Sequence, residues 1–248
     1  MASSPFRHAR NASVPPGAAM SGPEAEERVV SAVVEAILSH RIAPGARLIE
    51  RELALASGAN RSAIRNGLIR LAHSGLVELS PNKGATIAMC SPEEAAQIFD
   101  ARVVIEASTV RSLTLNASAA EIAKLRAFVE EERLAYEAGK MEDARHLSRR
   151  FHLLLAELAG NAVLTGIVRD LINRQPLLSW SRKATKPRFC GNHAHSDIVD
   201  AIERGNVDEA ARLNTEHLRE LERELRADRE SAPAKASRTT HSSDQEFS

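Results

Sequence analysis

The sequence predicts a mainly α-helical protein of two domains, an N-terminal winged helix-turn-helix followed by a C-terminal, all-α antiparallel helical bundle. Three observations predict this fold class. The chain has 248 residues, and a single core usually stops growing beyond roughly 250 to 300 residues, so one small and one larger domain fit the length. Strand patterns are confined to residues 76–88, and helical periodicity covers most of the remaining chain. Only eight aromatic residues are present, six Phe, one Trp and one Tyr, so aliphatic residues must fill the cores.

Composition divides the chain into four segments. Residues 1–24 are rich in Ser, Pro, Gly and Ala, and residues 228–248 are rich in Ser, Thr and charged residues. Neither segment has enough apolar side chains to offset the entropy lost on ordering, so both are predicted to be disordered tails. Between them we expect the winged helix-turn-helix domain at residues 25–89 and the helical domain at residues 91–227.

The elements of the first domain follow from periodicity and turn residues. Apolar residues at helical spacing and the turns after them predict helices at 26–40, 50–57 and 61–73 and strands at 76–79 and 85–88. Pro44-Gly45 forces a turn after the first helix, and Gly58 and Gly75 end the second and the third. Residues 80–84 are turn-rich and join the two strands as a hairpin. The order helix, helix, turn, helix, hairpin is typical of a winged helix-turn-helix.

The second domain contains no strand signal. Its helices are predicted at 91–115, 118–138, 141–159, 162–174, 193–204 and 207–227. Ser91 with Glu94, and Ser118 with Glu121, match the capping-box pattern that begins a helix. Pro176 is expected to end the fourth of these helices. Consecutive helices joined by short turns predict an antiparallel bundle.

Charge is unevenly distributed although the net charge is zero. Residues 28–88 contain eight Lys/Arg and four Asp/Glu, which gives 8 − 4 = +4. Residues 91–227 contain 20 Lys/Arg and 22 Asp/Glu, which gives 20 − 22 = −2. A positive small domain beside a nearly neutral larger one is compatible with a nucleic-acid-binding module, although the bias is modest.

Several classes of protein are disfavoured. No run approaches the roughly 18 consecutive apolar residues of a membrane span, and the N-terminus lacks the apolar stretch of a secretory signal, so a cytoplasmic protein without a membrane partner is expected. The two cysteines, Cys90 and Cys190, form no Cys-x-x-Cys pair, so neither a disulfide framework nor a cysteine zinc site is indicated.

The third helix carries the residues suited to reading DNA. Arg61, Ser62 and Arg65 lie off its apolar stripe, and Asn60 stands at the N-cap, where backbone amides also favour a phosphate. An arginine can donate two hydrogen bonds to a guanine edge or act on a phosphate as a charge. The alternative is that Arg61 and Arg65 form only a solvated helix face.

This module resembles the GntR family of transcriptional regulators. The resembling stretches are residues 44–54, 58–65 and 71–77, with Gly84 in the wing. The resemblance implies that the operator is contacted by Arg51, Asn60, Arg61, Ser62 and Arg65 from the helices and by Lys83 and Gly84 from the wing tip. The family commonly has Glu and Ala where this chain has Asn66-Gly67. A glycine here weakens the helix by about 1 kcal/mol relative to alanine, and the preferred operator sequence is expected to differ.

Three histidines stand out in the second domain. His152, His195 and His217 each lie on a different predicted helix. Three imidazoles with one oxygen or water make a standard first shell for zinc, nickel or a similar divalent metal. Sequence spacing leaves open the alternative that each is a hydrogen-bonded core histidine or a surface histidine.

The second domain resembles the FCD ligand-binding domain of the FadR-like GntR subfamily over most of residues 91–227. In metal-binding members the ligands are three histidines and an aspartate one turn before the first histidine. The resemblance therefore implies metal ligation by His152, His195 and His217. Ser148 stands at the aspartate position, and its hydroxyl binds a divalent ion far more weakly than a carboxylate.

The same resemblance implies where an effector binds. Arg102, Ser148 and Asn161 are the expected contacts for a small organic acid, and Arg102 would pair with its carboxylate. The alternative for Arg102 is a salt bridge to Glu106 at i+4.

Together these features predict a DNA-binding transcriptional regulator, and specifically a repressor controlled by a small carboxylate with a divalent metal in the second domain. A homodimer with a palindromic operator is expected, because each small module alone binds weakly. Alternatives are a metal-sensing regulator and a three-histidine metal hydrolase. The chain contains no His-Glu-x-x-His, no Gly-x-Ser-x-Gly and no P-loop, so an enzyme is not expected.

Overall fold

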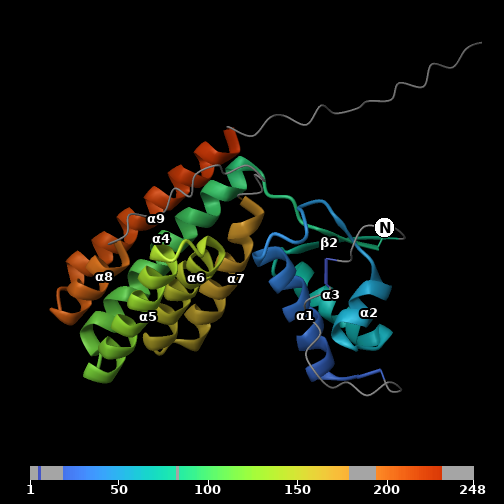
Figure 1. The fold of residues 1–248 in the computed structure, drawn as a ribbon, viewed down its shortest axis with the longest axis horizontal. Helices are drawn as coiled ribbons and strands as arrows, with labels where there is room; N and C mark the ends of the chain where they lie inside the picture. Colours follow the sequence, from blue (N-terminus) through green and yellow to red (C-terminus); the bar gives the residue numbers. More distant parts are fainter. Residues whose placement is uncertain (1–4, 7–18, 82–83, 179–193, 231–248) are drawn as a thin grey trace, which may run out of the picture.

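The computed structural model describes residues 5–6, 19–81, 84–178 and 194–230, and within these residues it shows a small N-terminal domain beside an elongated helical bundle (Figure 1). The helices are α1 (Pro23–Leu38), α2 (Glu50–Ser57), α3 (Arg61–His73), α4 (Pro92–Asn116), α5 (Ala119–Glu137), α6 (Met141–Leu158), α7 (Ala162–Leu178), α8 (Ala194–Glu203) and α9 (Val207–Glu230). The strands are β1 (Arg47–Leu48), β2 (Val77–Ser80) and β3 (Gly84–Ile87). The predicted fold class is confirmed.

Local sequence signals set the helix ends in the N-terminal domain. Gly58 ends α2 with φ 69°, a left-handed conformation that favours glycine. Asn60 begins α3, because its side-chain oxygen accepts a hydrogen bond of 2.9 Å from the backbone amide of Ala63. The helix-turn-helix is thus fixed by one glycine and one capping asparagine two residues apart.

The wing is a three-stranded antiparallel sheet in the order β1-β3-β2. Val77 pairs with Ile87 and Ser80 with Gly84, so both hairpin strands are shifted by one residue from the predicted ranges. The strand β1 was not predicted, because two residues are too short to show an alternating pattern. Leu48 in β1 is buried, and pairing with β3 fixes its position.

The helical domain is built around α4 and α9, which pack along each other, with α5, α6, α7 and α8 completing the bundle (Figure 1). Ser118 and Glu121 form a complete capping box at the start of α5, as predicted. The predicted end of α7 is wrong, because the helix continues through Pro176 to Leu178. None of the described helices is long and apolar enough to cross a membrane.

The predicted tails fall mostly on residues outside the described ranges. For residues 19–24 the prediction of disorder is wrong, because Met20 exchanges backbone hydrogen bonds of 2.8 Å with Gly58 and Asn60, and Pro23 begins α1. At the other end α9 reaches Glu230, three residues beyond the predicted end at 227.

The two domains share apolar packing at their junction. Phe99 from α4 and Leu177 from α7 are buried in the same cluster as the core of the N-terminal domain. Arg174 of α7 forms an ion pair with Glu94 of α4, and its guanidinium also covers Gly75 just after α3. The predicted boundary at residues 89–91 therefore marks a change of secondary structure and not the edge of a core.

Gly67 has a packing role that its helix propensity hides. A Cβ atom added at Gly67 would lie 2.9 Å from Cγ1 of Val29 and 3.3 Å from the backbone oxygen of Glu26. Val29 is fully buried in α1, so its short branched side chain has no room to move away. The adjacent Asn66 donates a hydrogen bond of 2.8 Å to the Glu26 carboxylate. The pair Asn66-Gly67 thus fits the close approach of α1 to α3.

We predict that Gly67→Ala lowers the free energy of unfolding. Overpacking against α1 should cost about 1 to 3 kcal/mol, which exceeds the gain of about 1 kcal/mol in helix propensity. The matched control is Gly166→Ala in α7, where an added Cβ has no atom within 4 Å and should raise stability. Urea unfolding followed by circular dichroism measures both. A Gly67→Ala protein as stable as Gly166→Ala would contradict the packing role.

Candidate nucleic-acid interface and buried histidine cluster

One face of α3 is free of the core and carries basic and polar side chains. Ile64 and Leu68 are buried beneath it, whereas Arg61, Ser62 and Arg65 are exposed. The side chain of Arg61 is 92% exposed, and its Nε lies 3.7 Å from the Glu50 carboxylate, a contact too open to hold the guanidinium. Arg65 forms no ion pair with any described residue. Both arginines are therefore available to an external partner.

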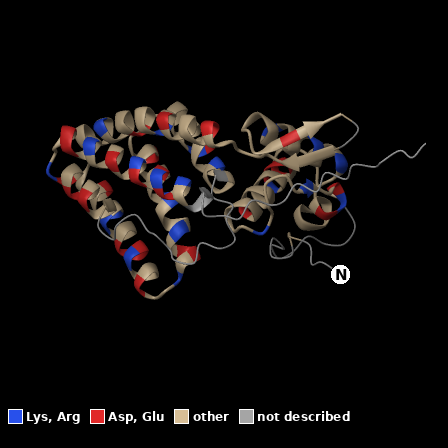
Figure 2. Ribbon diagram, turned by 90° about the horizontal axis from the view of Figure 1, so that it is seen from above, with Lys and Arg blue, Asp and Glu red and all other residues tan. Residues whose placement is uncertain are grey.

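A groove of about 1220 Å³ runs between this face of α3 and the wing. Its lining includes Arg61, Ser62 and Arg65 from α3, Gly84 from the wing and Arg47 from β1. Figure 2 shows Lys and Arg positions on the ribbon of the N-terminal domain. Arg47 was missed by the sequence analysis, because the strand that carries it was not found. Its guanidinium lies 3.7 Å from the position that a Cβ on Gly84 would occupy, so it adds positive charge beside the wing.

The other predicted DNA contacts lie around the same helix-turn-helix. Arg51 is exposed on α2, and Asn60 caps α3. Gly84 begins β3 with φ 85°. Lys83 lies outside the described residues. The structure thus places Arg61, Ser62, Arg65 and Gly84 on one groove.

The helical domain brings the three singled-out histidines together in its interior. His152 of α6, His195 of α8 and His217 of α9 are all buried. Nε2 of His217 lies 3.1 Å from Nε2 of His152 and 3.0 Å from Nε2 of His195. One nitrogen from each ring lies within 4.8 Å of the others, a spacing that can hold a metal ion.

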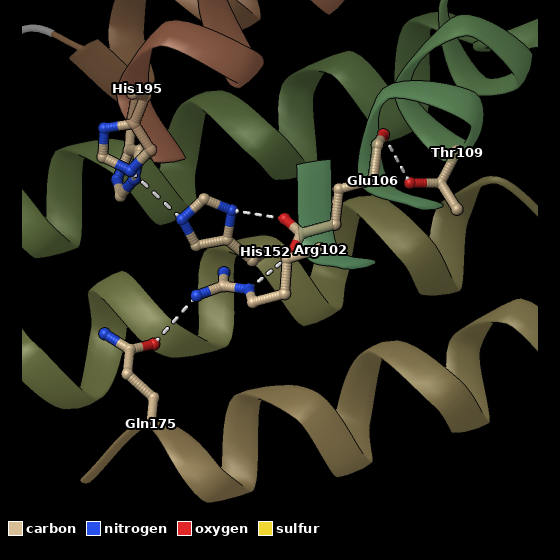
Figure 3. A network of polar contacts seen from close by, with 7 residues as sticks. Arg102, Glu106, Thr109, His152, Gln175 and His195 are labelled. Atoms are coloured by element: carbon tan, nitrogen blue, oxygen red, sulfur yellow. Dashed lines mark hydrogen bonds and ion pairs between the residues drawn. The ribbon is translucent and has the colours of Figure 1, made fainter. Parts of the chain in front are cut away.

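Two carboxylates orient the outer nitrogens of the cluster. Nδ1 of His152 lies 2.9 Å from Glu106 of α4 (Figure 3). Nδ1 of His195 lies 2.6 Å from Glu132 of α5. A carboxylate this close to Nδ1 favours the tautomer that carries its proton on Nδ1 and a lone pair on Nε2. Glu132 could not be found from the sequence, because nothing in sequence links α5 to α8.

The tautomers leave the centre of the cluster short of protons. His152 and His195 both direct an Nε2 lone pair toward Nε2 of His217, which has at most one proton to donate. Burial lowers the pKa of His152, and burial together with the neighbouring histidines lowers the pKa of His217 well below its usual range, so both rings are neutral near pH 7. The three Nε2 atoms converge on one point, and this arrangement of imidazole nitrogens fits a divalent cation.

Arg102 and Glu106 form a buried ion pair beside the histidines. Nε of Arg102 donates a hydrogen bond of 2.6 Å to Glu106, and Nη1 donates one of 3.1 Å to Gln175 of α7 (Figure 3). Burial alone raises the pKa of Glu106, but the charge of Arg102 and the contact with His152 outweigh it and lower the pKa to about 2. The predicted i+4 salt bridge is confirmed. This salt bridge does not exclude a contact between Arg102 and the carboxylate of an effector, because Nη2 of Arg102 is buried and has no partner among the described residues.

Asn214 is a second incomplete polar group in this region. It is fully buried on α9, one helical turn before His217, and neither its Oδ1 nor its Nδ2 has a hydrogen-bond partner among the described residues. Nδ1 of His217 is also buried and without one. Buried polar atoms normally find partners, so these atoms indicate a site for a polar ligand or water. The i, i+3 spacing of Asn214 and His217 was a signal that the sequence analysis did not use.

The other two predicted effector residues differ in position. Ser148 lies half-buried on α6, one turn before His152, as the resemblance implies. Asn161 is exposed, and its Oδ1 accepts hydrogen bonds from the amides of Val163 and Leu164 at the start of α7. The structure therefore gives Asn161 a capping role and does not place it in the buried cluster.

Comparisons with known proteins agree with both parts of the chain. Residues 25–87 match the family described as bacterial regulatory proteins, gntR family, and residues 97–247 match the FCD domain. The transcriptional repressor RspR of Escherichia coli is 24% identical over 188 residues, which cover 75% of this chain and 82% of RspR. The Nta operon transcriptional regulator of Aminobacter aminovorans is 28% identical over 181 residues, 73% of this chain and 85% of that protein.

The solved structure of E. coli McbR/YncC has the same fold. Its TM-score against this chain is 0.75 at 20% sequence identity, and the match covers 85% of this chain and 100% of that one. At this identity the likeness establishes the fold alone.

We predict that Glu106→Gln strongly destabilises the helical domain, because it leaves the Arg102 charge buried without a counter-charge. Breaking a buried pair in this way costs about 3 to 5 kcal/mol. The folded-state pKa of Glu106 lies below its ordinary value of 4.5, so its stabilisation is complete above about pH 4.5 and declines as the pH falls toward 2.

Urea unfolding of Glu106→Gln and of the double variant Arg102→Met/Glu106→Gln measures this effect. The double variant removes both charges and should be the more stable of the two. If Glu106→Gln alone is as stable as the wild type, the ion pair does not organise the domain.

Proposed function

The chain belongs to the GntR family of transcriptional regulators and carries an FCD domain, and from this we propose that it is a repressor whose operator affinity is set by a small carboxylate bound beside the three histidines. The relatives are transcriptional regulators and not enzymes, so a hydrolytic role for the histidines is dropped. A repressor role is supported by the similarity to RspR, which is named a repressor.

One observation carries the effector proposal: polar atoms that lack partners lie in the domain interior where the histidines meet. Nη2 of Arg102 is a charged donor suited to a carboxylate oxygen. Asn214 offers one acceptor and two donors. An acid that also carries a hydroxyl or carbonyl group would complete both residues, and leaving such atoms unpaired costs about 1 to 3 kcal/mol each. The effector is therefore a small polar acid.

A divalent metal, zinc or nickel, is proposed at the three Nε2 atoms. The donor set supports it, because His152 and His195 each have a carboxylate at Nδ1 that orients the ring, as metal-bound histidines usually do. Such an ion would supply a positive charge that attracts the effector's carboxylate. Ser148 contributes no charge at the position where related sites have aspartate, so the effector's oxygens would have more effect on metal affinity here.

DNA recognition is proposed to occur through two copies of the chain. Arg61 and Arg65 would read the major groove from α3, and Gly84 with Arg47 would place the wing near the backbone. A homodimer presents two such modules related by a two-fold axis, so the operator would be palindromic.

Selection of binding sites from random DNA should therefore return an inverted repeat. Selection of a single half-site would argue against the dimer.

We predict that Arg61→Ala and Arg65→Ala each weaken operator binding without lowering stability, because both side chains are exposed off the core. Loss of a bidentate base contact should cost about 1 to 3 kcal/mol and relax preference at one base pair, and loss of a phosphate contact should weaken all sequences equally. Fluorescence anisotropy at fixed salt on the selected operator measures affinity. The matched control is Arg204→Ala, an exposed arginine after α8. Equal affinity in all three variants would refute the assignment of α3.

We predict that Zn²⁺ binding weakens at least about tenfold in His195→Ala and strengthens in Ser148→Asp, because one loses a ligand and the other gains a charged oxygen. His146→Ala, an exposed histidine on the same helix as His152, serves as the matched control. Calorimetry with Zn²⁺ and Ni²⁺ gives the affinities, and a thermal-shift panel of small carboxylic acids gives the effector response.

Metal affinity and the response to acids together also distinguish the proposed function from two alternatives, structural histidines and a metal sensor. If no metal binds and His195→Ala keeps the response to acids, the histidines are structural. If chelation alone abolishes operator control with no acid present, the metal is the signal and the protein is a metal sensor.

A further inference from the structure

A cleft of about 700 Å³ lies between the two domains, away from both sites described above. Helices α1 and α3 line it from the N-terminal domain, and α6 and α7 line it from the helical domain. The described contacts between α1 and α7 bring these two helices together at the junction of the domains (Figure 1). Anything bound here touches both the DNA-reading helix α3 and the bundle.

The charged side chains of the cleft are mostly basic. The cleft is lined by four arginines, Arg70, Arg149, Arg150 and Arg169. Its only lining carboxylates among the described residues are Glu27 and Asp170, which leaves an excess of 4 − 2 = 2 positive charges. Three of these arginines have carboxylate neighbours. Arg70 pairs with Glu27 at 2.7 Å, and Arg150 and Arg169 lie 3.0 and 3.7 Å from Glu157. The fourth arginine is different.

Arg149 has no carboxylate partner among the described residues. Its Nε is buried and makes no hydrogen bond. Burial, and then the like charge of Arg145, lower the pKa of Arg149 to about 10 against the smaller opposing effect of the Glu142 carboxylate, so Arg149 remains a cation near pH 7. The guanidinium is thus held in a partly desolvated position by the fold, with a neighbour that repels it. Such a cation is costly unless a bound anion compensates it.

We propose that this interdomain cleft is an anion-binding site for a small multivalent oxyanion, with Arg149 as its central ligand. A phosphate or a polycarboxylate presents adjacent charged oxygens, which match the planar donors of a guanidinium. The volume accommodates either class, since ligand sites usually measure about 300 to 1000 Å³. Apolar side chains such as Val34 and Leu153 line the remaining wall and favour a carbon-containing anion over free phosphate.

The site is placed to couple the two domains. Helix α6 carries Arg149 in the cleft and His152 in the histidine cluster, and α7 carries Arg169 in the cleft and Gln175 against Arg102. On the other side of the cleft α3 carries Arg70 one turn beyond the DNA-facing residues. An anion bridging these helices would fix the orientation of α3 relative to the bundle.

Calorimetry of the full chain with citrate and with inorganic phosphate, at constant ionic strength, tests the proposal. Citrate should bind the wild type, and the dissociation constant should rise at least tenfold in Arg149→Gln and stay unchanged in the exposed control Arg204→Gln. Without anion, Arg149→Gln should melt at or above the wild-type temperature, because it removes an uncompensated charge. A purely structural arginine would instead lower it.

Citrate binding at the cleft should survive in His195→Ala, which alters only the histidine cluster. Loss of citrate binding in His195→Ala would place the anion at the histidines and overturn the proposal, as would equal binding in Arg149→Gln or no binding of either anion by the wild type. Tighter binding of phosphate than of citrate would retain the site but assign it to a phosphate ligand.

Operator affinity should change at least threefold with the preferred anion in the wild type and not in Arg149→Gln. An unchanged operator affinity in the wild type would overturn the coupling of the cleft to DNA binding.

Discussion

The helical domain depends on one buried network of charged and polar side chains. It runs from Arg102 through Glu106 to His152 and continues through His217 and His195 to Glu132. Its members come from α4, α5, α6, α8 and α9, so the relative positions of five helices are tied to the same set of contacts. Removing charges from water is costly unless each finds a partner, which is why these helices cannot shift independently.

Some buried polar atoms in and beside this network have no hydrogen-bond partner among the described residues. These atoms are the ones that a ligand could bind. A network built only for stability would satisfy every buried donor and acceptor. Here Nη2 of Arg102, the carboxamide of Asn214 and Nδ1 of His217 lack partners among the described residues. Binding sites commonly sacrifice stability in this way, because atoms left open to a ligand cannot also pair within the protein. The proposed effector site is therefore the unsatisfied part of the structural core.

The proposed control of DNA binding by this site requires a firm junction between the domains. The core of the N-terminal domain includes Phe99 of α4 and Leu177 of α7, so the two domains are not independent bodies joined by a linker. Helix α7 reaches this junction because it continues through Pro176. It also carries Gln175, which holds Arg102. Gln175 is adjacent to Arg174 and two residues before Leu177, and both of these side chains contact the N-terminal domain.

The sequence by itself determined the order of the helices and of the hairpin, most helix ends and the face of α3 that carries Arg61 and Arg65, because caps, turn residues and apolar periodicity act over a few neighbouring residues. It also indicated the three histidines, through the family resemblance. Only the tertiary structure decided what they contact. The partners Glu132 and Asn214, the unpaired Arg149 and the packing reason for Gly67 all depend on helices far apart in sequence. Local pattern cannot show which faces of those helices meet, since that choice is made by packing in three dimensions.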